Sequence, residues 1–240
     1  MRLTPHDSRQ HRRSNSLSSR IIQHAAFSCL LILIPSIVGL AQTPDKSSSS
    51  SSTGTEGIQK HWNEFGVWGG ISFNSPTPIG KTPDARFGDI GLRYGRVLAA
   101  TKTVAFEWTI DAIPLSILSN KRPTVVPAGS GFAIVLTRKS VNAWGAAPIG
   151  LKFNFRRNRR VQPFAQTTGG FLYFNEQAPV AGAARFNFTF DFSGGVQIVN
   201  PTRRAFTIGY KYQHISNGYR AKFNPGVDVQ MIFAGFSVFK

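Results

Sequence analysis

The chain has 240 residues, of which 41% are hydrophobic and only 16% are charged, with 28 Lys and Arg against 11 Asp and Glu. A chain this rich in apolar and aromatic residues is not intrinsically disordered over most of its length. The single cysteine, Cys29, excludes a disulfide framework, an iron–sulfur cluster and a cysteine zinc site. Beyond the N-terminal segment, no apolar run approaches the roughly 20 residues that a membrane-spanning helix needs.

The first 41 residues have the pattern of a cleaved export signal. Arginines precede an apolar run at residues 25–40, and Gly39 and Ala41 supply the small residues of a cleavage site after Ala41. Pro35 and these small residues argue against an uncleaved signal anchor. A Ser-rich tract follows, so we expect a flexible linker over residues 42–60 and one folded domain over residues 61–240.

From residue 63 onward, apolar and polar residues alternate with a period of two, which predicts β-strands with two chemically different faces. The clearest stretch is Arg185–Val199, in which phenylalanines alternate with polar residues. The same pattern predicts seven further strands. They lie at residues 63–73, 89–99, 103–112, 149–155, 161–175, 206–212 and 229–240.

The connections between these strands alternate in length. Residues 74–88, 119–142 and 215–228 are expected to form long loops, and residues 100–102, 157–160 and 200–204 short turns. Long loops at one end and tight turns at the other are typical of an outer-membrane barrel, and closure removes exposed strand edges. We therefore predict an all-β fold, an eight-stranded antiparallel transmembrane β-barrel in the outer membrane.

The competing fold is a soluble sandwich or a lipocalin-type barrel, in which the apolar faces would point inward. Two features favour the membrane barrel: the apolar faces are heavy in Phe, Trp and Tyr, and the opposite faces carry charges of both signs. Side chains can fill the interior of an eight-stranded barrel, so we expect these charges to pair in the lumen. They are Arg93, Lys152, Arg185 and Lys211 against Glu107, Asp111 and Asp191.

The last long loop carries the best candidate for chemistry. His214 and Ser216 are two residues apart at a strand end, so both project from the lipid-facing side. A histidine within hydrogen-bond reach can activate a serine hydroxyl, and a carboxylate can orient that histidine. Asp228 opens the next strand and can reach back to His214. Asn217 and Asn224 are candidate donors to an oxyanion.

The segment His-Ile-Ser-Asn at 214–217, followed by Asn-Pro-Gly-Val-Asp at 224–228, resembles the outer-membrane lipid A 3-O-deacylase (PagL-type) family, also called acyloxyacyl hydrolases. The resemblance implies Ser216 as nucleophile, His214 as base and Asp228 as the acidic member. Asn217 and Asn224 are the matching loop amides. The family has Glu at the acidic position, where this chain has Asp228.

This resemblance implies a serine esterase that removes an ester-linked 3-O acyl chain from lipid A of lipopolysaccharide in the outer leaflet, without a metal or a cofactor. The alternatives are a non-catalytic structural or lipopolysaccharide-binding barrel and a soluble periplasmic lipid-binding barrel. We expect no nucleic-acid partner, and a homodimer is left open. Eight basic residues on the long-loop side are candidates to attract lipid A phosphates. They are Lys81, Arg86, Lys121, Arg122, Arg138, Lys139, Arg220 and Lys222.

Overall fold

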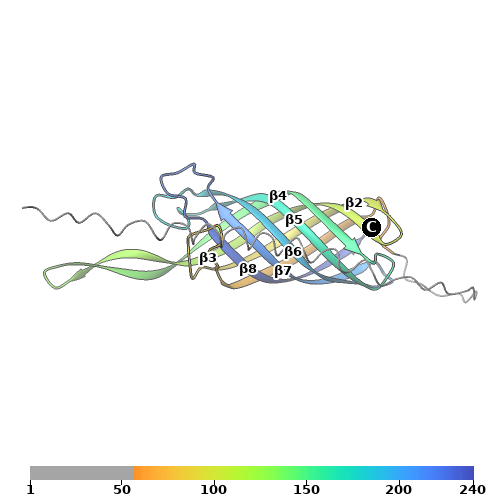
Figure 1. Ribbon diagram of the computed structural model, residues 1–240, viewed down its shortest axis with the longest axis horizontal. Helices are drawn as coiled ribbons and strands as arrows, with labels where there is room; N and C mark the ends of the chain where they lie inside the picture. Colours follow the sequence, from red (N-terminus) through yellow and green to blue (C-terminus); the bar gives the residue numbers. More distant parts are fainter. Residues whose placement is uncertain (1–56) are drawn as a thin grey trace, which may run out of the picture. The chain divides into compact units, whose positions relative to one another are not determined.

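The computed structural model describes residues 57–240, so the predicted signal segment and the linker up to residue 56 lie outside the described residues. Eight antiparallel strands form a closed barrel in which each strand pairs with its neighbour in the chain and the last pairs with the first (Figure 1). The predicted fold class is confirmed. Residues 57–240 contain no helix long and apolar enough to cross a membrane. The strands are β1 (Asn63–Asn74), β2 (Arg86–Ala100), β3 (Val104–Ala128), β4 (Gly131–Phe155), β5 (Val161–Phe174), β6 (Phe186–Val199), β7 (Arg204–Ser216) and β8 (Val227–Phe239).

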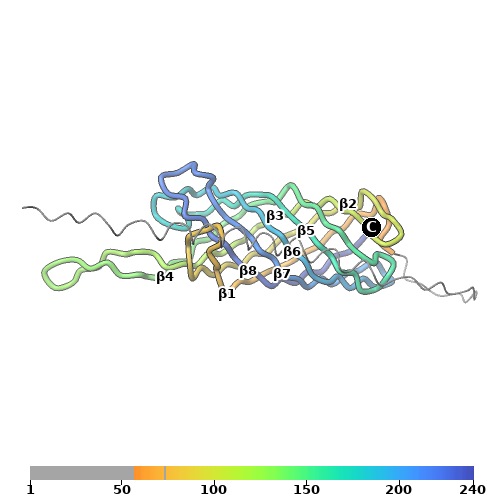
Figure 2. Tube along the Cα trace, viewed as in Figure 1, coloured from red at the N-terminus to blue at the C-terminus, as the bar shows by residue number. Residues whose placement is uncertain are grey.

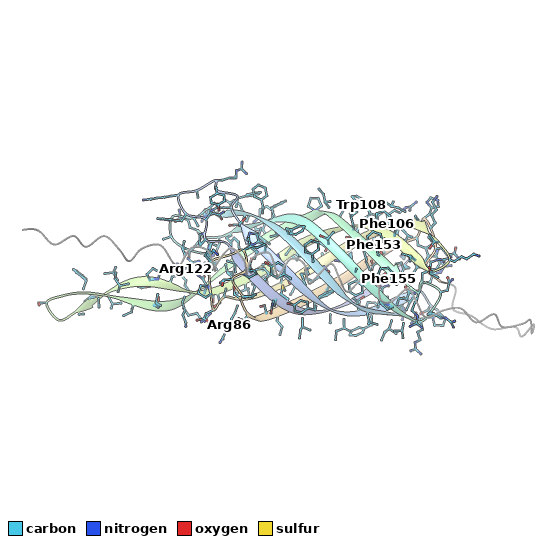
Figure 3. All side chains as sticks on the ribbon, viewed as in Figure 1. Arg86, Phe106, Trp108, Arg122, Phe153 and Phe155 are labelled. Atoms are coloured by element: carbon cyan, nitrogen blue, oxygen red, sulfur yellow. The ribbon has the colours of Figure 1, made fainter. Side chains whose placement is uncertain are left out.

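The outer surface of the barrel is apolar, as the period-two pattern predicts. Phe188, Phe190 and Phe192 alternate outward along β6 and are each more than 40% exposed. Aromatic side chains also gather on the outside near the tight-turn end, where Phe106 packs against Phe153 with ring centroids 5.0 Å apart (Figure 3). A water-soluble protein does not leave so large an apolar band uncovered, whereas a bilayer solvates it.

The interior is filled in layers along the strands. Apolar side chains cluster at the long-loop end, including Leu118, Phe174 and Met231, and a second apolar cluster around Trp62 and Phe239 closes the tight-turn end. Buried polar and charged residues occupy the strand centres between the two clusters. The lumen is therefore a packed core, as expected for eight strands.

Ion pairs organise the central layer. Lys152 Nζ lies 2.9 Å from Glu64 Oε2 and 3.5 Å from Glu107 Oε2, and all three side chains are almost completely buried. Arg93 makes a two-pronged contact with Asp111, with N–O distances of 2.8 and 2.7 Å. These charges are tolerated in a low-dielectric interior because each of them has an opposite partner within 3.5 Å.

The lumen charges differ from the sequence-based prediction at three residues: Glu64, Asp89, which is also buried, and Arg185. Glu64 pairs with Lys152 in the lumen, although the alternation in residues 63–73 was too weak to identify it as a lumen charge. Arg185, predicted to lie in the lumen, is instead exposed just before β6, where its guanidinium donates a hydrogen bond to the backbone carbonyl of Asn175. The alternation of β6 begins one residue later, so the lumen prediction for Arg185 is wrong.

The predicted long loop at residues 119–142 is also wrong, because β3 and β4 continue through it as a hairpin that extends beyond the barrel (Figure 1). Pairing runs from Asn120↔Lys139 to Ala128↔Gly131, and the turn uses Gly129 at a φ of 58°. β-Branched residues on both arms favour this pairing. The sequence predicts Pro123 to be a loop residue. Pairing of β3 with β2 ends at Ser119, so the edge of β3 beyond this residue is unpaired by β2 and tolerates a proline.

The end of the expected linker packs against the tight turns. Ile58 is fully buried, and its backbone N–H donates to the carbonyl of Arg157 at 3.3 Å. The Arg157 guanidinium in turn donates to the carbonyl of Ile58 at 2.9 Å. Part of the basic β4–β5 turn therefore holds residues 57–60 in place.

The long-loop end is where distant segments meet. The β1–β2, β5–β6 and β7–β8 loops come together at this end of the barrel, beside the base of the hairpin (Figure 2). The Phe223 N–H donates to the carbonyl of Gly182 at 3.3 Å, which joins the last two of these loops. The candidate catalytic residues lie at this rim.

Candidate active site

His214 and Asp228 face each other directly across β7 and β8. They are register partners, and His214 Nδ1 lies 2.6 Å from Asp228 Oδ1. Antiparallel partners project from the same face of a sheet, which explains why residues fourteen positions apart in the chain meet. A carboxylate only accepts hydrogen bonds, so in the neutral imidazole this contact favours the tautomer with the proton on Nδ1 and Nε2 as the acceptor.

Ser216 shares the outward face with His214. Two residues of a strand are separated by about 7 Å, a gap that the imidazole can largely span. The Ser216 hydroxyl makes no hydrogen bond to any residue between 57 and 240 in this structure. His214 is 19% exposed, and its outward direction follows that of Tyr210 and Ile208, which are both nearly half exposed on the lipid side.

Asp228 is completely buried, although it lies on the outer face of the barrel. The β1–β2 loop covers it, and the backbone N–H groups of Ile79 and Gly80 both donate to Asp228 Oδ2 at 2.8 Å. One carboxylate oxygen is therefore bound by two backbone donors, and the other is left for His214. This arrangement fixes the carboxylate and keeps it ionised.

The sequence did not reveal this support. Backbone N–H groups carry no side-chain signal, and residues 74–88 were predicted only as a long loop. Only Gly80 hints at the close approach of this loop to Asp228. A Cβ at Gly80 would lie 3.0 Å from the backbone atoms Gly226 C, Val227 N and Asp228 N. Further hydrogen bonds join the loops: Thr82 Oγ1 to the Gly226 carbonyl at 2.7 Å and Lys81 N–H to the Pro225 carbonyl at 2.5 Å.

The two predicted loop amides contact each other. Asn224 Oδ1 accepts the backbone N–H of Asn217 at 3.0 Å, and Asn217 Nδ2 donates to the Phe223 carbonyl at 2.8 Å. Asn217 is fully buried, so its side chain holds the loop. Asn224 is only half-buried, and its amide N–H₂ makes no hydrogen bond to a residue that the structure describes. Of the two, Asn224 has the donor left to offer a substrate.

Apolar and basic groups surround the serine. Ser216 pairs in register with Phe188 of β6, whose ring is 43% exposed. The Arg220 guanidinium lies 5.7 Å from the centre of that ring and 5.9 Å from the ring of Phe186, within cation–π range. The site thus lies between the exposed apolar surface of β6 and the guanidinium of Arg220.

Several of the predicted phosphate-attracting residues have partners within the protein. Lys121 Nζ lies 2.8 Å from Asp84 Oδ2, and this hydrogen bond and the lysine charge hold the pKa of Asp84 below its usual value. Arg138 donates to the backbone carbonyls of Asp84 and Ser119 at 3.1 and 3.0 Å. These cations brace the hairpin against the β1–β2 loop as well as giving the rim a positive charge.

Comparison with known proteins extends this description. The family model described as Lipid A 3-O-deacylase (PagL) matches residues 135–237, a range that includes His214, Ser216 and Asp228. Residues 135–237 of the barrel are thus similar to the PagL family. The resemblance predicted from the motif at 214–228 is therefore confirmed, and the protein is an outer-membrane barrel. A comparison with the curated proteins gives no significant match.

Two solved structures of outer-membrane proteins are also similar to this chain. The crystal structure of the outer membrane enzyme PagL is 13% identical with a TM-score of 0.51, covering 71% of this chain and 97% of that one. The crystal structure of Neisserial surface protein A is 13% identical with a TM-score of 0.42, covering 73% of this chain and 96% of that one. At this identity, the likeness to PagL is a likeness of fold.

Proposed function

We propose that this chain is a serine esterase of the outer membrane that removes an ester-linked acyl chain from the 3-O position of lipid A. The fold and the family model support an outer-membrane lipid A 3-O-deacylase. The observation that carries the mechanism is the 2.6 Å contact between His214 Nδ1 and Asp228 Oδ1, with Ser216 on the same outward face.

In the proposed reaction, Ser216 Oγ attacks the ester carbonyl while His214 Nε2 takes the hydroxyl proton. Asp228 holds the imidazole in the tautomer that leaves Nε2 free and stabilises the imidazolium that forms. The sugar 3-hydroxyl leaves with the proton from His214, and an acyl-serine remains. Water, activated by the same histidine, then releases a free fatty acid and restores the serine.

The location of the site suits a substrate that never leaves the membrane. Lipid A has its acyl chains in the bilayer and its phosphorylated sugars at the surface. Ser216 lies at the outer rim with exposed phenylalanines of β6 below it and Arg220 above. An ester at the boundary between chains and sugars can therefore reach Ser216 laterally from the bilayer. Asn224 is the residue we assign to the oxyanion, through its unpaired amide.

The test is hydrolysis of purified lipid A by the purified barrel in detergent, followed by mass spectrometry of the lipid and the released fatty acid. The wild-type barrel should lower the mass of lipid A by one ester-linked acyl group. Ser216→Ala should release nothing, and Ser193→Ala is the matched control because Ser193 lies on β6 away from the rim. Heat-modifiable migration in gels confirms that each variant is folded.

Release of fatty acid by a folded Ser216→Ala barrel at the wild-type rate would overturn the serine mechanism. A wild-type barrel that binds lipid A but leaves its mass unchanged would favour the alternative, a non-catalytic barrel that binds lipopolysaccharide.

A further inference from the structure

A pocket of about 560 Å³ lies beside the base of the extended hairpin. One wall comes from the hairpin, and the other comes from the β5–β6 loop and the residue before β6. Arg122 marks its position at the hairpin base in Figure 3. The pocket takes no lining residue from β7, β8 or the loop between them, so it is separate from the candidate active site. Its lining is Arg122, Pro123, Thr124, Thr137, Lys139, Glu176, Gln177, Val180, Ala181 and Arg185.

The pocket has an excess of positive charge. Lys139 forms an ion pair with Glu176, and that hydrogen bond holds the pKa of Glu176 below its usual value. The remaining cations, Arg122 and Arg185, form no ion pair within 4 Å of a carboxylate among residues 57–240, although the charge of Glu176 acts on both. Arg185 donates one hydrogen bond to the Asn175 carbonyl. Two guanidinium groups thus line a single pocket with only backbone or amide acceptors.

Arg122 has a donor that the protein does not satisfy. Its Nε donates a long hydrogen bond of 3.5 Å to Asn120 Oδ1, while its Nη2 is buried without a hydrogen-bond partner among the described residues. Burial lowers the pKa of Arg122, and the nearby charge of Glu176 only partly opposes this. A buried charged donor without an acceptor is costly, so an anionic ligand at this position would be strongly favoured.

We propose that this pocket binds a phosphate ester on the sugar headgroup of lipopolysaccharide. A guanidinium presents paired N–H donors that match two oxygens of a phosphate. The volume is in the range of small-molecule sites and accommodates a phosphorylated sugar. Thr124 and Thr137 add hydroxyl groups, 2.6 Å apart, that can bond to a sugar. The choice of lipopolysaccharide as the source rests on the proposed function.

Contacts through the β5–β6 loop connect this pocket to the loop beside Ser216. Gln177, a lining residue, accepts the backbone N–H of Gly182 at 2.8 Å. The carbonyl of Gly182 accepts the N–H of Phe223, whose own carbonyl accepts Asn217 Nδ2. An occupied pocket would therefore stabilise the loop that follows the nucleophile.

Binding is measured by titration calorimetry on the purified barrel in detergent, in a Ser216→Ala background, so the result does not depend on esterase activity. The probes are the bisphosphorylated glucosamine disaccharide of lipid A without its acyl chains, and inorganic phosphate. The disaccharide should bind saturably and at least about tenfold more tightly than inorganic phosphate. Arg122→Gln and Arg185→Gln should each weaken it by about tenfold, the usual size of a charge-assisted hydrogen bond.

Arg160→Gln is the matched control, since Arg160 is an exposed arginine that lies outside the pocket, in the tight turn before β5. It should change the affinity by less than about twofold, as is usual for a surface charge. Equal affinities for the disaccharide and inorganic phosphate would overturn the assignment to a headgroup. Equal losses in all three variants, or no saturable binding, would overturn the site itself. Because Arg122 lies on the hairpin outside the barrel, its substitution should leave heat-modifiable migration unchanged.

Discussion

The ion pairs of the lumen and the His214–Asp228 pair at the rim are built from similar groups in different surroundings. In the lumen, Lys152 lies between two buried carboxylates, and apolar clusters close the interior above and below them. At the rim, Asp228 is just as buried, but its partner is a histidine that is 19% exposed. The lumen pairs contact only other interior groups, whereas the histidine of the rim pair is partly exposed and has a second ring nitrogen that Asp228 does not contact.

We therefore expect the lumen pairs to contribute to the stability of the fold and the rim pair to contribute to catalysis. A buried pair whose partners are all internal has no group left for a substrate, so its removal should weaken the fold. The rim pair has a backbone-bound carboxylate on one side and, on the other, a histidine on the same outward face as Ser216. Changes at the rim should therefore alter turnover, and changes in the lumen should alter the free energy of unfolding.

Loss of the nucleophile or the base should have the largest effect on turnover. Ser216→Ala and His214→Ala should each reduce ester cleavage by at least about 10⁴-fold, and the double variant should be no worse, because the two groups act as one unit. Initial rates of fatty-acid release at saturating lipid A measure this. If the fold-reduction in the double variant equals the product of the two single fold-reductions, the two residues act independently.

Asp228→Asn should reduce turnover by roughly 10²-fold, which is within the usual range of acid–base contributions. The amide oxygen can still accept the N–H groups of Ile79 and Gly80, so the loop should stay in place, but the amide N–H₂ would face His214 and favour the wrong tautomer. Asp228→Ala additionally leaves both backbone donors unpaired. An Asp228→Asn barrel with wild-type kcat would remove Asp228 from the mechanism.

Gly80→Ala should have a smaller effect, a loss of about fivefold in turnover. The added Cβ would lie 3.0 Å from the backbone around Val227, so the β1–β2 loop must move and its bonds to Asp228 lengthen. Gly131→Ala is the matched control, because the same methyl at the hairpin turn meets its nearest atom only at 4.0 Å. Equal rates for the two variants would mean that the loop does not position Asp228.

Lys152→Met should leave turnover per folded molecule within about twofold of wild type. Its effect should appear in unfolding, with a loss of about 3–5 kcal/mol, because Glu64 and Glu107 would lose their shared cation. Urea titration of folded barrels in lipid vesicles, monitored by heat-modifiable migration, measures the stability. A stable Lys152→Met barrel with lost activity would contradict the division between lumen and rim.

The alternation of residues was enough to predict the barrel and the direction of most side chains. It placed His214 and Ser216 outward, and antiparallel pairing brought Asp228 to His214 as expected. It failed where the signal is not periodic: the hairpin at 119–142 contains prolines that mimic a loop, and a free strand edge tolerates them. The donors Ile79 and Gly80 act through backbone atoms, and only the glycine at position 80 hints at this role in the sequence.

The most direct test of the central claim is to find where a serine-reactive reagent binds and whether activity falls with it. The wild-type barrel would be treated with a long-chain alkyl fluorophosphonate, and the modified peptide mapped by mass spectrometry while lipid A deacylation is followed in the same samples. We predict a single adduct on Ser216, activity that falls in step with the modified fraction, and no adduct in His214→Ala. Full activity after complete modification of Ser216, or inactivation with the adduct on another residue, would contradict the account.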